Sequence, residues 1–344
     1  MSQVTRDDEL ERDDALAEQQ RMPWWQRAAA GSSTWIGLIL VGLIVVFTLI
    51  NPTDFLDIAN IRNIATDASV LLIMASGMTY VIITAGIDLS VGAVLVFSGV
   101  IAVKAMDLVG GDNWGTILAG LAGALLAGLA WGIFNGFLIA KARIPPLIVT
   151  LGTLGMALGA ALLITGGVDE REVPFKLVTT VGSGRLFDQV PYLVLVAFAV
   201  ALVFGIVLAQ TRFGRYTYAV GSNEEGARRA GVKVDRHLIK VYALSGTLAG
   251  LAGFLSLARF STTTLGGHNT DNLQSIAAVV IGGTSLFGGI GTMLGTVFGV
   301  FIPAVLTNGF VIIGVQTFWQ QVAVGAVLIA AVYFDQLRRA RKRQ

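Results

Sequence analysis

The sequence contains no cysteine and only two histidines. The absence of cysteine excludes structural disulfides, thiolate metal sites and a cysteine nucleophile. His237 and His268 stand apart from other metal-ligand residues, so we expect each in a loop or an interface and no metal site. The chain also lacks a phosphate-binding loop, a nucleophile elbow and a His-Glu-x-x-His motif. It is therefore not expected to hydrolyse ATP or to act as a hydrolase.

Charge is also scarce. Of the 344 residues, 13% are charged and 54% are hydrophobic, and the mean hydropathy is +0.73. No soluble core could bury that much apolar surface, so the composition predicts an all-α integral membrane protein whose main partner is the lipid bilayer. The basic residues gather at the ends of apolar runs rather than in a stripe with aromatics, which argues against a nucleic-acid partner.

Apolar runs separated by polar, glycine or proline residues predict a bundle of about ten transmembrane helices, some short or discontinuous. Residues 1–34 lack the apolar stretch of a signal peptide and are expected to form a flexible acidic tail, while 336–344 form a basic tail. The membrane domain is expected over 35–335. The predicted spans are 35–50, 68–85, 91–106, 115–139, 147–165, 191–209, 241–259, 273–288, 291–308 and 319–334.

Basic residues divide unequally between the two sides implied by these spans. An even number of spans places both termini on one side, together with Lys141, Arg143 and the segment 210–240. By the positive-inside rule, this side is cytoplasmic. Arg259, on the other side, is expected to extend to the outer interface, and pairing with a carboxylate is the alternative. Of the 24 basic residues, that other side holds only Arg62, Lys104, Arg171, Lys176, Arg185 and Arg259.

The polar segment 210–240 carries seven of the basic residues and contains a short self-capping sequence. Ser222-Asn223-Glu224-Glu225 is typical of a capping box, in which Ser222 accepts the amide of Glu225 and Glu225 reaches back to the amide of Ser222. The sequence therefore predicts a short cytoplasmic helix, which we interpret as a docking surface.

Charges along this helix support the same prediction. Glu224 and Arg228, and likewise Glu225 and Arg229, are spaced i, i+4 in the favourable order. Acidic residues at the start and basic residues at the end complement the helix dipole. Gly231 can adopt a left-handed conformation and end the helix.

The glycine-rich segment 86–92 places Asp88 and Ser90 at or near membrane depth. An uncompensated carboxylate there costs about 2.5–3.5 kcal/mol. Asp88 is expected to cap the next helix by accepting hydrogen bonds from the amides near Ser90 and Val91. A direct role in binding a solute or an ion remains open, because a capping residue can also lie beside a transport pathway.

A second glycine-rich segment, 282–291, contains Thr284 and Ser285 but no charge. Glycine-interrupted apolar segments often mark discontinuous helices that line a transport pathway. Glycines also recur at four-residue spacing, which predicts close helix packing. These glycines are Gly128, Gly132 and Gly136; Gly155 and Gly159; Gly246 and Gly250; and Gly291, Gly295 and Gly299.

Several ordered motifs together cover most of the chain from about residue 35. Through them the chain resembles the permease subunits of ribose- and xylose-type ATP-binding-cassette sugar importers, within the monosaccharide and branched-chain amino acid permease superfamily. The motifs are VIITAGIDLSVG at 81–92, AVGSNEEGAR at 219–228, YALSG at 242–246, LAGLAG at 248–253, IAAVVIGGTSL at 276–286 and LTNG at 306–309.

The resemblance implies a multi-pass subunit of the bacterial plasma membrane that is not itself an enzyme. It implies a cytoplasmic ATPase partner that uses ATP and Mg²⁺, an extracytoplasmic sugar-binding protein, and a second permease copy or sister permease. This chain would bind no cofactor. The resemblance assigns ATPase coupling to Ser222, Asn223, Glu224, Glu225, Arg228 and Arg229.

One departure from the family pattern concerns the substrate. Family members usually carry acidic residues before the IAAVV run, where this chain has Asn272 and Gln274 after Asp271. The specific sugar is therefore left open, as are branched-chain amino acids, nucleosides and other small polar solutes. An ion-coupled secondary transporter, with Asp88 binding the ion, is a further alternative. The translocation pathway is expected to include Asp88, Ser90, Asn272, Gln274, Thr284 and Ser285.

Overall fold

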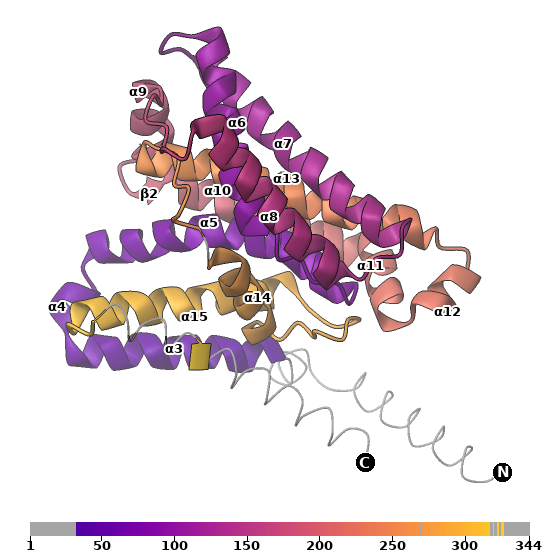
Figure 1. Cartoon of the computed structure of the whole chain (residues 1–344). Helices are drawn as coiled ribbons and strands as arrows, with labels where there is room; N and C mark the ends of the chain where they lie inside the picture. The colour runs from indigo at the N-terminus through magenta and orange to yellow at the C-terminus, as the bar shows by residue number, and fades with distance from the viewer. Residues whose placement is uncertain (1–31, 269, 317–318, 320–321, 323–324, 327–344) are drawn as a thin grey trace.

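The computed structural model describes residues 32–268, 270–316, 319, 322 and 325–326. Its long elements are apolar helices, which confirms the predicted all-α membrane protein (Figure 1). These are α3 (Ser32–Ile50), α5 (Ile58–Ile83), α6 (Val91–Val109), α7 (Trp114–Ala140), α8 (Pro146–Thr165), α10 (Tyr192–Gln210), α13 (Val234–Phe260), α14 (Asp271–Ile281) and α15 (Met293–Ile312).

Shorter elements connect the long helices. One pair of two-residue strands forms an antiparallel hairpin, with Arg185 opposite Pro191. Phe187 and Asp188 have φ values of 50° and 57°, so the turn between the strands is left-handed. The connecting elements are α4 (Pro52–Phe55), α9 (Phe175–Leu177), the π-helix η1 (Val178–Gly182), β1 (Arg185–Leu186), β2 (Val190–Pro191), α11 (Arg212–Ser222) and α12 (Glu224–Arg229).

Among the described residues, seven helices are long and apolar enough to cross a membrane, and Thr34–Ile50 and Asp271–Ile281 are shorter apolar helices. The predicted span 319–334 and both tails fall almost entirely outside the described residues. Three predicted boundaries were wrong by seven residues or more. Helix α5 begins at Ile58 rather than at residue 68, α14 ends at Ile281 rather than at residue 288, and α13 begins at Val234 rather than at residue 241.

Polar residues explain the first error and glycine the second. Asn60, Asn63 and Asp67 lie inside α5, because tertiary contacts hold polar residues in a helix that a hydropathy pattern would exclude. Helix α14 stops where Gly283 adopts a φ of 83°, a conformation that only glycine adopts without cost.

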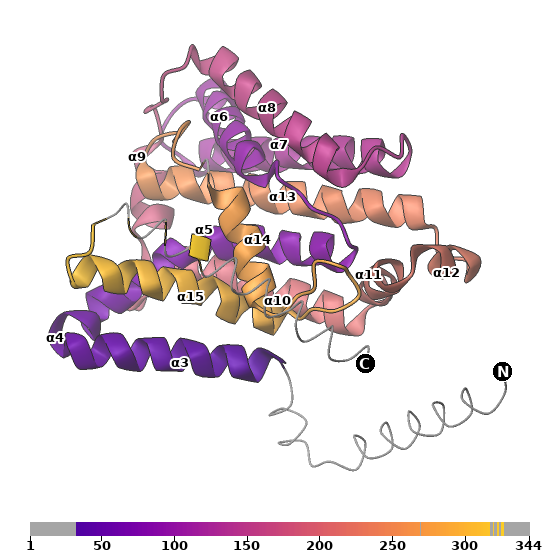
Figure 2. The same ribbon diagram turned by 60° about the horizontal axis from the view of Figure 1, so that its bottom comes forward.

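Helix α13 lies at the centre of the bundle and packs against α5, α6 and α7 (Figures 1 and 2). Its crossing with α7 is very close. A Cβ on Gly128 would lie 2.1 Å from the carbonyl oxygen of Gly246, and one on Gly132 would lie 2.3 Å from that of Tyr242. The predicted close packing is thus confirmed here. It was wrong for Gly155 and Gly159, where nothing in the described chain lies within 4 Å.

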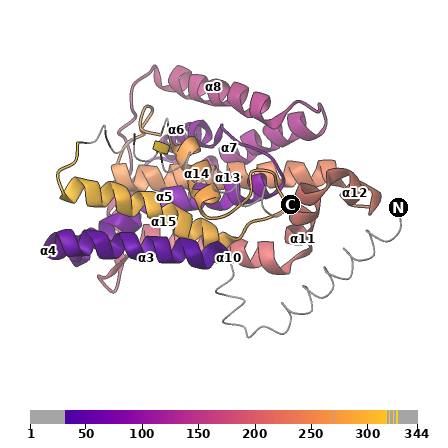
Figure 3. The same ribbon diagram turned by 90° about the horizontal axis from the view of Figure 1, so that it is seen from below.

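The bundle has two ends, which Figure 3 shows on opposite sides of the molecule. The α12 end comprises the connections 141–145 and 211–233, and the α4 end comprises 51–57, 110–113, 166–191 and 261–268. Lys141, Arg143 and the basic residues of 210–240 lie at or next to the α12 end, and the six basic residues assigned to the opposite side lie towards the α4 end. The structure thus keeps the two predicted groups apart.

Candidate functional site

Helix α12 begins differently from the prediction. Asn223 is its N-cap, with extended backbone angles and a side chain that accepts the Gly226 amide at 2.8 Å. The predicted capping box was wrong, because Ser222 is still the last residue of α11. An N-cap needs a non-helical backbone, and asparagine caps at least as well as serine. The Glu225 carboxylate is left to bind Arg229 instead.

The predicted ion pairs of α12 are confirmed. Arg228 contacts Glu224 at 3.0 Å and Arg229 contacts Glu225 at 3.1 Å. Gly231 has a φ of 85°, as a helix stop requires. Arg228 also donates to Asp235 at 3.0 Å, and these hydrogen bonds, that to Asp235 first, raise the pKa of Arg228 above its ordinary value. Arg228 therefore stays charged at any physiological pH.

Asp235, in the first turn of α13, binds a second cation as well. Lys141, which follows α7, contacts the other carboxylate oxygen of Asp235 at 3.0 Å. One carboxylate thus joins α12, α13 and the connection after α7.

The end of α11 touches both glycine-rich segments. The Gly289 amide donates to the carbonyl of Ile83, the last residue of α5, at 2.9 Å. Gly221 lies so close to the same carbonyl that an added Cβ would be 1.7 Å from its oxygen. Tyr218 donates its hydroxyl to the Gly291 carbonyl at 2.7 Å. The chain entering α12 is therefore packed directly on the segment after α14.

The first glycine-rich segment holds Asp88 in a buried polar cluster. One carboxylate oxygen accepts the Ser90 amide at 3.0 Å and its hydroxyl at 2.6 Å, and the other accepts the Ser245 hydroxyl at 3.2 Å. The predicted Ser90 amide bond is confirmed, but Ser90 itself is the N-cap of α6. Asn135 donates to the Ser90 hydroxyl at 2.8 Å, and Asn272 donates to the Leu89 carbonyl at 3.1 Å. The structure thus brings Asp88, Ser90 and Asn272 together.

The second glycine-rich segment is held mainly by backbone hydrogen bonds, such as that from the Ser285 amide to the Ile290 carbonyl at 2.9 Å. Ser285 is buried and accepts the Phe287 amide at 3.1 Å. Thr284 is buried as well, and its hydroxyl has no hydrogen-bond partner within the described chain. Within the described chain, neither Thr284 nor Ser285 forms a side-chain hydrogen bond with the Asp88 cluster.

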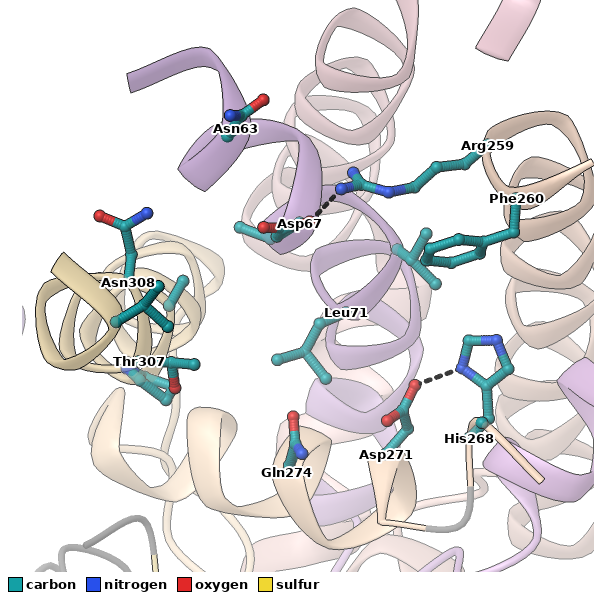
Figure 4. Close-up of a pocket in the computed structure, with 16 residues that line it drawn as sticks. Asn63, Asp67, Leu71, Arg259, Phe260, His268, Asp271, Gln274, Thr307 and Asn308 are labelled. Carbon is teal, nitrogen blue, oxygen red and sulfur yellow. Dashed lines mark hydrogen bonds and ion pairs between the residues drawn. The ribbon is translucent and has the colours of Figure 1, made fainter. Parts of the chain in front are cut away.

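A cavity of about 700 Å³ lies between α5, α13, α14 and α15 (Figure 4). Its walls come from the first half of α5, the last residues of α13, the start of α14 and the second half of α15. These are the parts of α5 and α13 farthest along the chain from the contacts with α11 and α12, so the cavity lies towards the α4 end. Its polar lining residues are Asn63, Asp67, Arg259, His268, Asp271, Gln274, Thr307 and Asn308.

Two pairs of charged or ionisable groups line this cavity. Arg259 forms an ion pair with Asp67, which is the alternative of pairing with a carboxylate rather than the preferred extension to the interface. His268 contacts Asp271 at 2.7 Å through Nδ1 and the Ser256 hydroxyl at 2.9 Å through Nε2. No group of potential metal ligands occurs in the described residues.

Sequence reasoning found few of the cavity residues. Of the six predicted pathway residues only Gln274 lines the large cavity. Asn63 and Asp67 were missed although their four-residue spacing, continued by Leu71, puts them on one face of a helix. Thr307 and Asn308 were part of a quoted motif but were given no role.

Comparison with known proteins identifies the family. Residues 60–332 match the family described as the permease component of branched-chain amino acid transport systems. The D-allose transport system permease of Escherichia coli is 37% identical over 87% of this chain and 90% of its own length. The ribose import permease of Bacillus subtilis is 36% identical over 89% and 92%. The fructose import permease of Rhizobium meliloti is 34% identical over 87% and 84%. The chain therefore belongs to the permease-component family of branched-chain amino acid transport systems.

Proposed function

We propose that this chain is the membrane-spanning permease of an ATP-driven importer for a monosaccharide. The similar permeases named above are those of D-allose, ribose and fructose systems, and each is similar over most of this chain. The observation that carries the proposal is the charged helix α12, which is exposed at one end of the bundle and is packed through α11 on the segment 282–292.

In this proposal α12 docks on a cytoplasmic ATPase that hydrolyses ATP with Mg²⁺. The basic residues of the α12 end favour its cytoplasmic placement, together with both termini, in the bacterial inner membrane. Arg229 and Glu225 are largely exposed, with side chains 79% and 66% accessible, and so are free to meet a partner. A second permease, either a copy or a sister chain, completes the transporter.

The opposite end would receive the sugar from an extracytoplasmic binding protein. The cavity lies towards that end, whereas towards the α12 end Ile83, Gly221 and Gly289 are in close contact. This arrangement corresponds to a conformation with its solute space on the outer side. Nucleotide binding shifts the transporter between conformations only through its different affinity for each. Movement of α12 would reach the second glycine-rich segment through Gly221 and Tyr218.

The test is uptake by the complete transporter in proteoliposomes, with radiolabelled D-ribose, D-allose, D-fructose and L-leucine as solutes. We expect ATP-dependent uptake of at least one sugar and none of leucine. Leucine uptake would contradict the sugar assignment, and uptake driven by an ion gradient without ATPase would contradict the ATP-driven mechanism.

The role of α12 is tested in the same assay. Replacing Glu224, Glu225, Arg228 and Arg229 by alanine should abolish ATP-dependent uptake and retention of the ATPase on the purified permease. The control exchanges each residue for the shorter one of like charge, aspartate or lysine, and should retain most uptake. Unchanged coupling in the alanine variant would exclude α12 as the docking element.

A further inference from the structure

The cavity between α5, α13, α14 and α15 has the size of a ligand site. Its volume of about 700 Å³ lies within the range of about 300–1,000 Å³ typical of small-molecule sites. Four helices from distant parts of the sequence form its wall, so it is a feature of the fold rather than a surface hollow of one loop (Figure 4).

The polar groups in the wall have hydrogen-bonding capacity left over. Asp67 binds Arg259 through one carboxylate oxygen, and Asp271 binds His268 through one, leaving the second oxygen of each without a donor in the described chain. The Gln274 amide donates to Thr270, so its carbonyl oxygen is also unused. Arg259 Nη1 is a buried donor without a partner in the described chain, although its guanidinium charge is paired with Asp67. The unused oxygens of Asp67, Asp271 and Gln274 are acceptors.

Donors and apolar surface complete the wall. The Asn63 side chain is exposed and makes no hydrogen bond within the described residues, so its amide can donate as well as accept. Phe260 is 48% exposed and lines the cavity beside Leu71 and Val311. An apolar surface with a few placed polar groups is the usual composition of a site that binds a small polar molecule.

These groups can form complementary hydrogen bonds with a neutral polyol. Hydroxyl groups can donate to the free oxygens of Asp67, Asp271 and Gln274 and accept from Asn63, while the C–H face of a sugar ring can cover Phe260. Phosphate and carboxylate groups carry no proton to donate at neutral pH. Their oxygens would face the acceptor oxygens of Asp67, Asp271 and Gln274 without a hydrogen between them, which is unfavourable.

We propose that this cavity is a binding site for a neutral sugar on the permease itself, so that the permease contributes selectivity during transit. The inference rests on the proposed function, since it assigns a solute to that pathway. Asp67, Asp271 and Gln274 accept hydroxyl protons, Asn63 donates, and Phe260 packs on the ring. Arg259 and His268 are positioning residues that orient the two carboxylates.

Saturation-transfer difference NMR tests the site. The full-length permease with its ATPase, in lipid nanodiscs and without any binding protein, is mixed with D-ribose or D-allose at millimolar concentration. We expect saturation transfer to the ring protons of a neutral sugar and none to D-ribose 5-phosphate or L-leucine. The variants Gln274→Leu and Phe260→Leu should each lower the sugar signal by about five-fold, the effect of losing one contact.

Two further variants separate loss of sugar binding from loss of folding. Asn63→Leu changes an exposed side chain without a hydrogen bond, so it should fold normally and still weaken the signal. Glu170→Gln, in an ion pair with Lys104 away from the cavity, should leave the signal unchanged. Equal signals from sugar and sugar phosphate, or a sugar signal that no cavity variant lowers, would overturn the site. So would the absence of a signal from a preparation that transports sugar, whereas absence of transport would instead refute the proposed function.

Discussion

The two glycine-rich segments differ in how they satisfy their polar groups. In the first, Asp88 lies in the core and its two oxygens accept three hydrogen bonds from Ser90 and Ser245. In the second, Thr284 is buried with an unpartnered hydroxyl in the described chain, and Gly288 and Gly289 contact α11. The comparison indicates that side-chain hydrogen bonds hold the first segment, whereas backbone hydrogen bonds and contact with α11 hold the second.

The largest effect should come from removing the carboxylate of the first segment. Asp88→Ala leaves the Ser90 amide and the Ser245 hydroxyl buried without an acceptor, at about 1–3 kcal/mol for each stranded donor. We expect a clear fall in the thermal midpoint of the purified permease. Asp88→Asn retains one acceptor oxygen and should lose less. Equal midpoints for wild type and Asp88→Ala would show that the first segment does not stabilise the fold.

A smaller effect on stability but a specific loss of coupling is expected at Gly221. Its added Cβ in Gly221→Ala would lie 1.7 Å from the Ile83 carbonyl oxygen, so α11 must move away, at an overpacking cost of about 1–3 kcal/mol. ATP-dependent uptake should fall while the ATPase still hydrolyses ATP. Gly152→Ala in α8 is the control, because nothing in the described chain lies within 4 Å of its added Cβ. Normal ATP-dependent uptake by Gly221→Ala would show that this contact does not couple the ATPase to transport.

The smallest effect should be at Thr284. Thr284→Val removes a hydroxyl that has no partner in the described chain, so the thermal midpoint should stay the same or rise. Ser245→Ala, on α13, removes a hydrogen bond to Asp88 of the first segment. That bond is worth about 0.5–1.5 kcal/mol, so the thermal midpoint should fall. If the two midpoints shift alike, the distinction between the segments is wrong.

Long apolar runs allowed the sequence to predict the helices, since lipid admits few other structures. The i, i+4 pairs of α12 were equally predictable because they depend on local spacing alone. The N-cap of α12 was less predictable than its ion pairs. Ser222 and Asn223 are both good N-cap residues, and the packing of α11 decides between them.

The cavity could not be predicted in the same way. Asp67 and Arg259 are 192 residues apart, and Gln274 lines the same cavity because α14 packs beside α5 and α15. Asp88 attracted attention as a charge at depth, yet its partners lie on α13 and in its own turn. A single sequence shows which residues are unusual but not which distant residues they meet.

The shared carboxylate of Asp235 has a mechanical consequence. Through Lys141 and Arg228 it fastens α12 to both α7 and α13, and these two helices cross almost backbone to backbone, so we expect them to turn as one rigid body with α12. Gly221 contacts the segment leading into α15, so we expect the same displacement to reach that segment. The cavity has α13 on one wall and α14 and α15 on another. It therefore lies between the expected rigid body of α7, α12 and α13 and the helices α14 and α15. A small rotation of that body should change the width of the cavity.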